Sequence, residues 1–326
     1  MKNKLTFTLL TCTLFLLLSC DALQEQKTIK LAHGLDMGHP VHKAMVFMGQ
    51  ELEKNSNGAL QLEIYPNQQL GSERQCLELL QIGSLDMTKV SAAVMENFSP
   101  NMKVLGLPFL FKNKEHTFKV LDGEVGKSLL DGGKKYWLKG LGYYDAGSRS
   151  FYTKEAPVEK PENLEGLKIR VMESVTAMDM VRNLGGSPTP ISYGELYTAL
   201  QQGVVDGAEN NPPSFFLSRH YEVCKFYSLD EHTTIPDVLI MSTHIWDKLS
   251  KKEQVWMQKA ADASVKYQRK LWAQAETEAI EAVKQAGVLV VQPEKTRFQE
   301  KVSSMYDDYK EDKEIYKLIS RIQAIQ

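Results

Sequence analysis

Apolar and polar residues alternate along positions 166–172, which read Gly-Leu-Lys-Ile-Arg-Val-Met. An alternation with a period of two predicts a strand with one buried face, and it directs Arg170 away from the buried side. The guanidinium presents a planar fork of donors that matches a carboxylate, so Arg170 is a candidate anchor for an acidic small molecule. A solvated arginine on an edge strand would give the same local pattern.

The remainder of the chain predicts strands and helices in turn. Before residue 140 these elements are expected at 29–32, 41–55, 60–64, 71–83 and 85–90. Such strand–helix–strand units predict a parallel sheet whose ligand-binding groups gather at the carboxyl ends of the strands. A second region of the same kind begins at Leu141 and includes the strand at 166–172. The pattern therefore predicts an α/β fold with two such regions.

One long helix follows the second region. Ser250 and Glu253 form a capping-box sequence, and neither Gly nor Pro occurs again until Gly287. At 1.5 Å per residue, roughly 36 positions would span about 54 Å, which is longer than a domain of this size. Apolar residues are spread along the whole segment, so we expect one helix that bridges both regions.

The N-terminus has a different character. Lys2 and Lys4 precede an uncharged run that ends in Ser19-Cys20. The uncharged run between Lys4 and Cys20 is short for a membrane span and is typical of a signal peptide. The small residue before Cys20 resembles the lipobox of bacterial lipoproteins, which implies a signal peptide at 1–19, lipid on Cys20 and a polar spacer at 20–28. A plain signal peptide or an apolar anchor is the alternative.

Composition narrows the class further. The chain has 326 residues, enough for two domains, with 43% hydrophobic residues, 25% charged residues and a net charge of -2. Without a basic surplus, a nucleic-acid partner is not expected. Cys76 and Cys224 are expected to be buried free thiols rather than a disulfide. No Cys/His spacing of a zinc site occurs, so neither a metal nor a cofactor is expected.

Several motifs together resemble the solute-binding proteins of tripartite ATP-independent periplasmic (TRAP) transporters, the DctP type. They are the 166–171 strand, the segment 199–210 (Ala-Leu-Gln-Gln-Gly-Val-Val-Asp-Gly-Ala-Glu-Asn), Gln-Leu-Gly-Ser-Glu-Arg at 69–74 and the long helix. The resemblance implies a two-lobed α/β clamp with mixed sheets, in which lobe I takes residues 29–147 plus 236–275 and lobe II takes 148–235 plus 276–326. It also implies a monomer outside the cytoplasm, lipid-anchored to the cell membrane, that delivers an organic acid to a membrane permease.

The resemblance assigns the binding residues one by one. Arg170 matches the arginine that holds the substrate carboxylate, Asn210 matches an amide donor to the same group, and Arg149 occupies the place of a second arginine near it. Tyr193 stands at an aromatic lining position. The remaining expected contacts to the ligand are Glu73, His33, Ser91, Asn211, His232 and Asp237.

These residues indicate the class of ligand. Hydroxyl acceptors facing two arginines are typical of a site for a polyhydroxylated monoacid, and within the family the motifs are most similar to members that bind glucuronate or galacturonate. Diketogulonate, gluconate, sialic acid and dicarboxylates are the alternatives. A dicarboxylate binder would be expected to place a further cation in lobe I, and Glu73 and Asp237 argue against a dicarboxylate. An exported sugar-acid lyase or isomerase, with His33 or Tyr193 as base, lacks a catalytic constellation. A structural lipoprotein would leave the arginines without a role.

Overall fold

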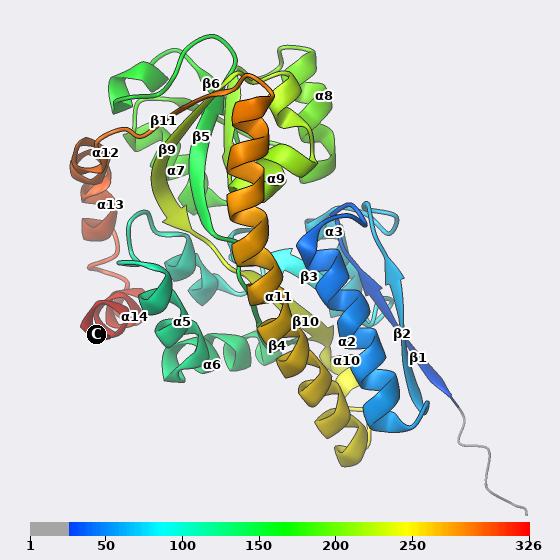
Figure 1. Ribbon diagram of the computed structural model, residues 1–326. Coiled ribbons are helices and arrows are strands. Elements are labelled where there is room, and N and C mark those ends of the chain that lie inside the picture. Colours follow the sequence, from blue (N-terminus) through cyan, green and yellow to red (C-terminus); the bar gives the residue numbers. More distant parts are fainter. Residues whose placement is uncertain (1–25) are drawn as a thin grey trace, which may run out of the picture.

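The computed structural model describes residues 26–326 and folds into two lobes, each built on one mixed β-sheet (Figure 1). The predicted signal peptide and lipidation site, 1–19 and Cys20, lie outside the described residues. In the first sheet the strand order is β2-β1-β3-β10-β4. Its strands are β1 (Lys27–Ala32), β2 (Leu60–Tyr65), β3 (Met87–Ser91), β4 (Leu138–Tyr144) and β10 (Asp237–Ser242). We call this sheet with its helices the first lobe.

The second sheet has the strand order β11-β9-β5-β8-β6-β7. Its strands are β5 (Ser148–Thr153), β6 (Lys168–Val171), β7 (Ser187–Pro190), β8 (Gly207–Asn210), β9 (Phe226–Thr234) and β11 (Leu289–Val291). Strand β6 is parallel to both β7 and β8, whereas β5 is antiparallel to both β8 and β9. This sheet with its helices is the second lobe.

Helices cover both sheets. They are α2 (Pro40–Ser56), α3 (Glu73–Gln81), α4 (Ala92–Met95), α5 (Lys114–Asp122), α6 (Glu124–Gly132), α7 (Val175–Asn183), α8 (Leu196–Gln201), α9 (Pro212–Leu217), α10 (Thr243–Trp246), α11 (Lys251–Gln285), α12 (Lys295–Val302), α13 (Ser304–Asp307) and α14 (Lys313–Ala324). Short 3-10 segments lie at η1 (Pro100–Gly106), η2 (Gly133–Tyr136), η3 (Pro161–Leu164), η4 (Tyr193–Glu195) and η5 (His220–Glu222). The apolar segment 105–111 contains the end of η1 and no strand.

Helix α11 bridges the two lobes, as predicted (Figure 1). Its first half packs beside α2 in the first lobe, where Met257 and Ala260 are buried. Its second half reaches the second lobe, where Val283 joins the core beneath α9. Apolar residues occur along the whole helix because its first half packs in a core of the first lobe and its second half in a core of the second lobe.

The chain also crosses between the lobes at 145–147 and at 235–236. At the first crossing Gly147 has φ +60, and an added Cβ would lie 2.2 Å from Glu276 Oε1 and 2.9 Å from Trp272 Nε1. Only glycine fits so close to α11 in this left-handed conformation. The crossing is thereby held against the helix that ties the lobes together.

The C-terminal segment does not stay with one lobe. Phe298 and Val302 of α12 join a core of the second lobe, but Ile315 and Ile319 of α14 join the core of the first lobe. The predicted lobe limits assign 276–326 to lobe II, so α14 departs from that prediction. The apolar stripe of α14 marks it as a packed helix, and the sequence holds no sign of which core it meets. The other limits stay a prediction.

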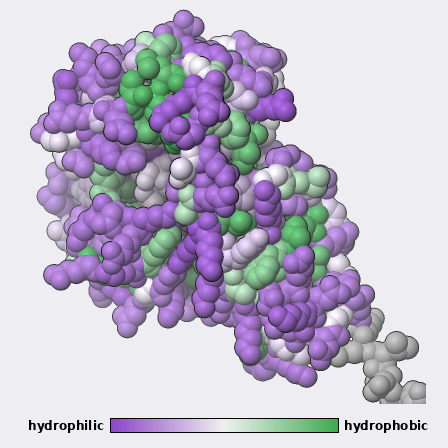
Figure 2. All heavy atoms as spheres, viewed as in Figure 1, coloured by the Kyte–Doolittle hydropathy of each residue, from purple (hydrophilic) through white to green (hydrophobic). Residues whose placement is uncertain are grey.

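The surface facing the viewer in Figure 2 is largely hydrophilic, with hydrophobic residues in separate areas. The outward face of α11 forms a polar band across both lobes. Among the described helices, none has the length and apolar character needed to cross a membrane.

Replacing Ser250 tests the start of α11. Ser250 Oγ accepts from Glu253 N at 3.3 Å, and Ser250 N donates to Glu253 Oε2 at 2.7 Å. We expect Ser250→Ala to lower the free energy of unfolding in urea by about 1 kcal/mol, because it removes the N-cap acceptor. Ser250→Asp, which keeps an acceptor, should stay close to wild type. Equal stability of the alanine variant and wild type would contradict the assignment.

Candidate functional site

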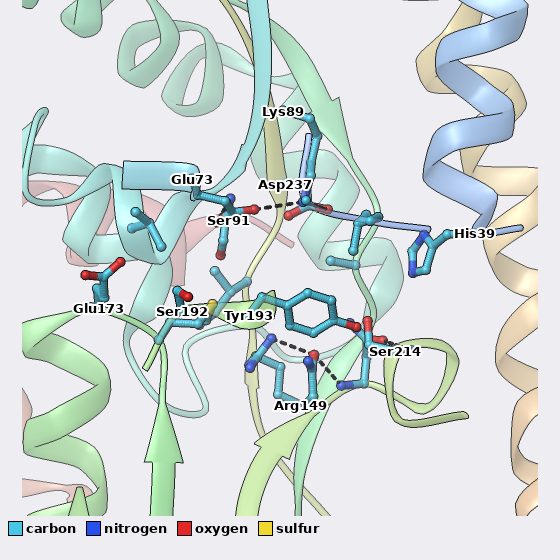
Figure 3. Close-up of a pocket in the computed structure, with 18 of the residues that line it drawn as sticks. His39, Glu73, Lys89, Ser91, Arg149, Glu173, Ser192, Tyr193, Ser214 and Asp237 are labelled. Atoms are coloured by element: carbon cyan, nitrogen blue, oxygen red, sulfur yellow. Dashed lines mark hydrogen bonds and ion pairs between the residues drawn. The ribbon is translucent and has the colours of Figure 1, made fainter. Parts of the chain in front are cut away.

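A pocket lies between the lobes, with walls from both sheets and from α11 (Figure 3). Most of the residues that the resemblance assigns line it: Glu73, Ser91, Arg149, Arg170, Tyr193, Asn210, Asn211 and Asp237. Parallel pairing explains part of this gathering, because Arg170 on β6 pairs with Ala208 on β8 and Asn210 follows on the same face. Both side chains therefore leave the sheet at its edge toward the first lobe.

Arg170 lines the pocket and keeps N–H donors without a partner among the described residues. Its side chain is 2% exposed, and Nε donates to the carbonyl of Ile191 at 2.8 Å. Nη1 is buried and has no hydrogen-bond partner among residues 26–326, and no carboxylate of that range forms an ion pair with this guanidinium. Burial lowers the pKa of Arg170, but a guanidinium stays protonated at neutral pH. An uncompensated buried cation of this kind favours an anionic partner.

Arg149 is engaged by the protein itself. Its Nε and Nη2 donate to the Glu209 carboxylate, with 2.8 Å between Nη2 and Oε1, and Nη2 also donates to the Glu209 carbonyl at 2.8 Å. Nη1 donates to Asn210 Oδ1 at 2.8 Å. A guanidinium has five N–H donors, so this arrangement leaves one for the pocket. Arg149 therefore acts mainly by positioning its neighbours.

The contacts of Asn210 determine the orientation of its amide. Oδ1 accepts from Arg149 Nη1 and from the backbone N–H of Asn211 at 2.9 Å. The amide nitrogen is left to donate, and the residue lines the pocket. Asn211 uses its own Oδ1 to cap α9 by accepting from Ser214 N at 2.9 Å. Because each residue uses only its Oδ1 in these contacts, both neighbours have an amide donor available.

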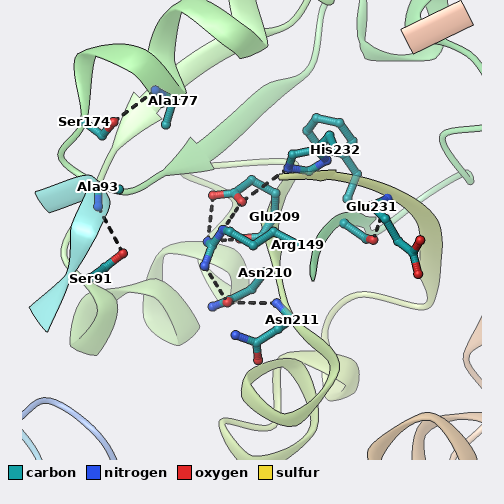
Figure 4. A network of polar contacts seen from close by, with 12 residues as sticks. Ser91, Ala93, Arg149, Ser174, Ala177, Glu209, Asn210, Asn211, Glu231 and His232 are labelled. Carbon is teal, nitrogen blue, oxygen red and sulfur yellow. Dashed lines mark hydrogen bonds and ion pairs between the residues drawn. The ribbon is translucent and has the colours of Figure 1, made fainter. Parts of the chain in front are cut away.

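His232 does not line the pocket, contrary to the prediction. It belongs to a polar network with Glu209 and Arg149 (Figure 4). Nδ1 is 2.8 Å from Asp230 Oδ2, and Nε2 is 3.5 Å from Glu209 Oε2. Burial by itself would lower the pKa of His232, but the two carboxylates raise it to about 9. The imidazolium form of His232 is stabilised because the carboxylates of Asp230 and Glu209 are buried beside it.

Glu209 is kept ionised by the same network. Burial would raise its pKa, but Arg149 and His232 outweigh burial and lower the pKa to about 2. The charges of Arg149 and His232 balance those of Glu209 and Asp230. The network therefore supports Asn210 without compensating Arg170.

His33 also does not line the pocket, contrary to the prediction. Its Nδ1 accepts from Leu35 N at 3.1 Å, and its Nε2 lies 3.0 Å from His42 Nδ1. Burial, with Lys89 and His42 nearby, lowers the pKa of His33 to about 3. Both ring nitrogens have partners, so this residue organises the loop before α2. The histidine of that loop that lines the pocket is His39.

The first lobe does contribute a buried cation, Lys89, which the sequence reasoning missed. Its ammonium lies 3.0 Å from Glu73 Oε1 and 3.2 Å from Asp237 Oδ2 (Figure 3). Burial would lower the pKa of Lys89, but the two carboxylates raise it above its ordinary value. Glu73 and Asp237 therefore neutralise this cation, and the interpretation that they disfavour a dicarboxylate stays a prediction. From the sequence alone, a lysine in the strand pattern of β3 is expected at the surface. Its burial depends on β10, a distant segment that places Asp237 beside it.

The three groups together still disfavour a second anion. Two carboxylates around one ammonium leave an excess of negative charge if all three are ionised. Glu73 also accepts from Ser91 N at 3.1 Å, which ties the cluster to the end of β3. This end of the pocket offers acceptors and one neutralised cation, an environment suited to hydroxyl groups.

Tyr193 is the remaining assigned residue that lines the pocket. The Tyr193 hydroxyl is 2.5 Å from Ser218 Oγ, so its polar end contacts the second lobe.

Cys76 and Cys224 are buried free thiols, as predicted. In the part of the chain that the structure describes, no cluster of His, Cys, Asp or Glu is suited to hold a metal ion.

Comparisons with known proteins agree on one family. Residues 31–312 match the model of the DctP family, described as bacterial extracellular solute-binding protein, family 7. A TRAP periplasmic solute-binding protein from Bradyrhizobium sp., in complex with α/β-D-galacturonate, is 43% identical with a TM-score of 0.89, covering 91% of this chain and 99% of that chain.

Two further solved structures have the same fold. A TRAP solute-binding protein from Xanthobacter autotrophicus with bound β-D-galacturonate is 40% identical, with a TM-score of 0.89, and covers 91% of this chain and 100% of that chain. One from Pseudomonas putida with bound D-glucuronate is 36% identical, with a TM-score of 0.89, and covers 92% of this chain and 98% of that chain.

The charge on His232 predicts a pH-dependent stability. A folded-state pKa of about 9, against an ordinary 6.5, means that its contribution is complete below pH 6.5 and is lost as the pH rises through 9. We expect His232→Gln to be less stable than wild type at about pH 6, with the difference in free energy of unfolding narrowing toward about pH 10. Urea unfolding across that range measures it. A difference that does not change with pH would contradict a charged His232.

Proposed function

Because this chain belongs to the DctP family of bacterial extracellular solute-binding proteins, we propose that it captures a hexuronate, D-glucuronate or D-galacturonate, for a TRAP transporter. Membership in a family of solute-binding proteins confirms the prediction of a binding protein over an exported lyase or isomerase. The proteins of known structure described above, with 36% to 43% identity, carry uronates in their complexes. That similarity supports the choice of ligand.

The observation that carries the proposal is the unpaired Nη1 of Arg170. A carboxylate placed against it would compensate the buried charge and complete the hydrogen bonding of the guanidinium. The free amide nitrogen of Asn210 and the remaining N–H of Arg149 come from neighbouring strands. Together these donors form a carboxylate site on the second lobe.

The opposite wall supports a ligand with hydroxyl groups rather than a second carboxylate. Glu73 and Asp237 accept hydrogen bonds, and they neutralise Lys89. A dicarboxylate would bring a second charge toward these acids, which costs free energy in a buried site. A sugar monoacid presents one charge to Arg170 and hydroxyl donors to the first lobe.

We propose residues 1–19 as a signal peptide and Cys20 as the lipidated first residue of a mature monomer outside the cytoplasm. The carboxylate site at Arg170 and the docking of the permease are then separate tasks of one chain.

Replacing Cys20 tests the anchor. We expect Cys20→Ala to release the protein from the membrane fraction into the soluble extracytoplasmic fraction, because no thiol remains to carry lipid. Labelling cells with a radioactive fatty acid should mark the wild type and not the variant. Equal membrane association of the two proteins would contradict lipidation at Cys20.

Replacing Arg170 tests the carboxylate site. We expect Arg170→Lys to raise the Kd for glucuronate by at least about 30-fold, because an ammonium cannot present two parallel donors to a buried carboxylate. Calorimetric titration measures the affinity, and circular dichroism checks the fold. Arg297→Lys is the control, since Arg297 is a surface residue of α12 paired with Glu162.

A panel of sugar acids and dicarboxylates tests the ligand class in the same preparation. Glucuronate and galacturonate should raise the melting temperature of the wild type, since a ligand that binds the native state stabilises it. A larger shift with a dicarboxylate, or wild-type affinity in Arg170→Lys, would be incompatible with the proposal. The uronate should be recovered unchanged, which NMR of the incubated mixture checks.

A further inference from the structure

His39 forms the N-cap of α2 and its side chain is 2% exposed. Its Nδ1 accepts from the backbone N–H of Val41 at 3.2 Å. A neutral imidazole has one protonated nitrogen, so a ring that accepts at Nδ1 carries its proton on Nε2. The cap thus fixes the tautomer and leaves Nε2–H as a donor.

That donor has no protein partner. Nε2 of His39 is buried and has no hydrogen-bond partner among the residues from 26 onward. Leaving a buried donor unpaired is unfavourable, so proteins rarely keep one without a reason. Both ring nitrogens of His33, six positions earlier in the same loop, are in contrast satisfied.

The imidazole of His39 belongs to the pocket wall. Its ring centroid lies 5.7 Å from that of Trp272 on α11. In Figure 3 it lies at the end of the pocket where the hydroxyl of Tyr193 and the side chain of Ser214 are found. It therefore reaches the pocket from the first lobe, opposite the residues of the second lobe.

His39 is an uncharged donor. Burial, and after it Lys89, lower the pKa of His39 well below its ordinary value. A neutral N–H gives less to a carboxylate than the guanidinium of Arg170 does. Its natural partner is an uncharged oxygen, such as a hydroxyl, a ring oxygen or a carbonyl.

We propose that His39 Nε2–H donates to an uncharged oxygen of the bound sugar acid, and that it selects for ligands that carry an oxygen at that position. This inference rests on the proposed function and adds a specificity-determining contact from the first lobe. A ligand without that oxygen leaves the donor buried and unpaired, and sites built around such a donor discriminate strongly against it. The carboxylate contact at Arg170 is independent of it.

The variant His39→Asn separates the two roles of the residue. Asn is among the best N-cap residues, so its Oδ1 can replace Nδ1 as the acceptor that caps α2. Its shorter side chain does not carry a donor to the position of Nε2. His42→Asn is the matched control, because His42 lies three positions later in the first turn of α2 and does not line the pocket.

Calorimetric titrations of wild type and both variants would use glucuronate, galacturonate and a series of monodeoxy derivatives. We expect His39→Asn to raise the Kd for the uronate that wild type binds by about 5- to 100-fold, and His42→Asn to leave it near the wild-type value. One monodeoxy derivative should bind wild type more weakly than the parent uronate does. The Kd of that derivative should not rise further in His39→Asn. That coupling identifies the oxygen that His39 contacts.

Three results would overturn the inference, and they differ from one another. Unchanged affinity in His39→Asn shows that the donor is not used. Equal weakening of the parent uronate and of every monodeoxy derivative shows a structural role only. Failure of wild type to bind any sugar acid overturns the proposed function and this contact with it, whereas the first two results leave the function standing.

Discussion

The structure depends on a buried guanidinium that the protein itself does not compensate. Arg170 is fixed by one backbone carbonyl and keeps Nη1 unpaired by any residue from 26 to 326. The charges around it are matched among themselves: Arg149 and His232 face Glu209 and Asp230. Because those acids are already paired, they are poor partners for Arg170. An anion from outside the chain is what the arrangement favours.

The two lobes divide the recognition of such an anion. The second lobe brings cationic and amide donors on β5, β6 and β8, whereas the first brings the Lys89 cluster on β3 and β10. A molecule between them contacts both lobes at once, so its binding favours the arrangement in which they face each other. Helix α11 and the crossings at 145–147 and 235–236 connect the two lobes. Ligand binding is thus linked to the relative position of the two lobes through α11 and the crossings.

The sequence was sufficient for the features that depend on local pattern and on motifs. The alternation around Arg170 placed its side chain on the opposite face from Ile169 and Val171, although the prediction of a single buried face was wrong because β6 is buried on both faces. The capping box at Ser250 located the start of the bridging helix. It was not sufficient where partners come from distant segments. Lys89 shows its burial only after β10 brings Asp237 beside it, and α14 gives no sign of which core it joins. Likewise, His33 and His39 both accept a backbone N–H at Nδ1, and they differ only at Nε2, which contacts His42 in His33 and has no partner among residues 26–326 in His39.

The central claim concerns one contact, between Arg170 and the carboxylate of a sugar acid. A crystal structure of the protein grown with glucuronate or galacturonate tests it most directly. The account predicts the carboxylate within hydrogen-bond distance of Arg170 Nη1, with the hydroxyl groups toward Glu73 and Asp237. A ligand with its carboxylate against Lys89, and Arg170 Nη1 still without a partner, would contradict it.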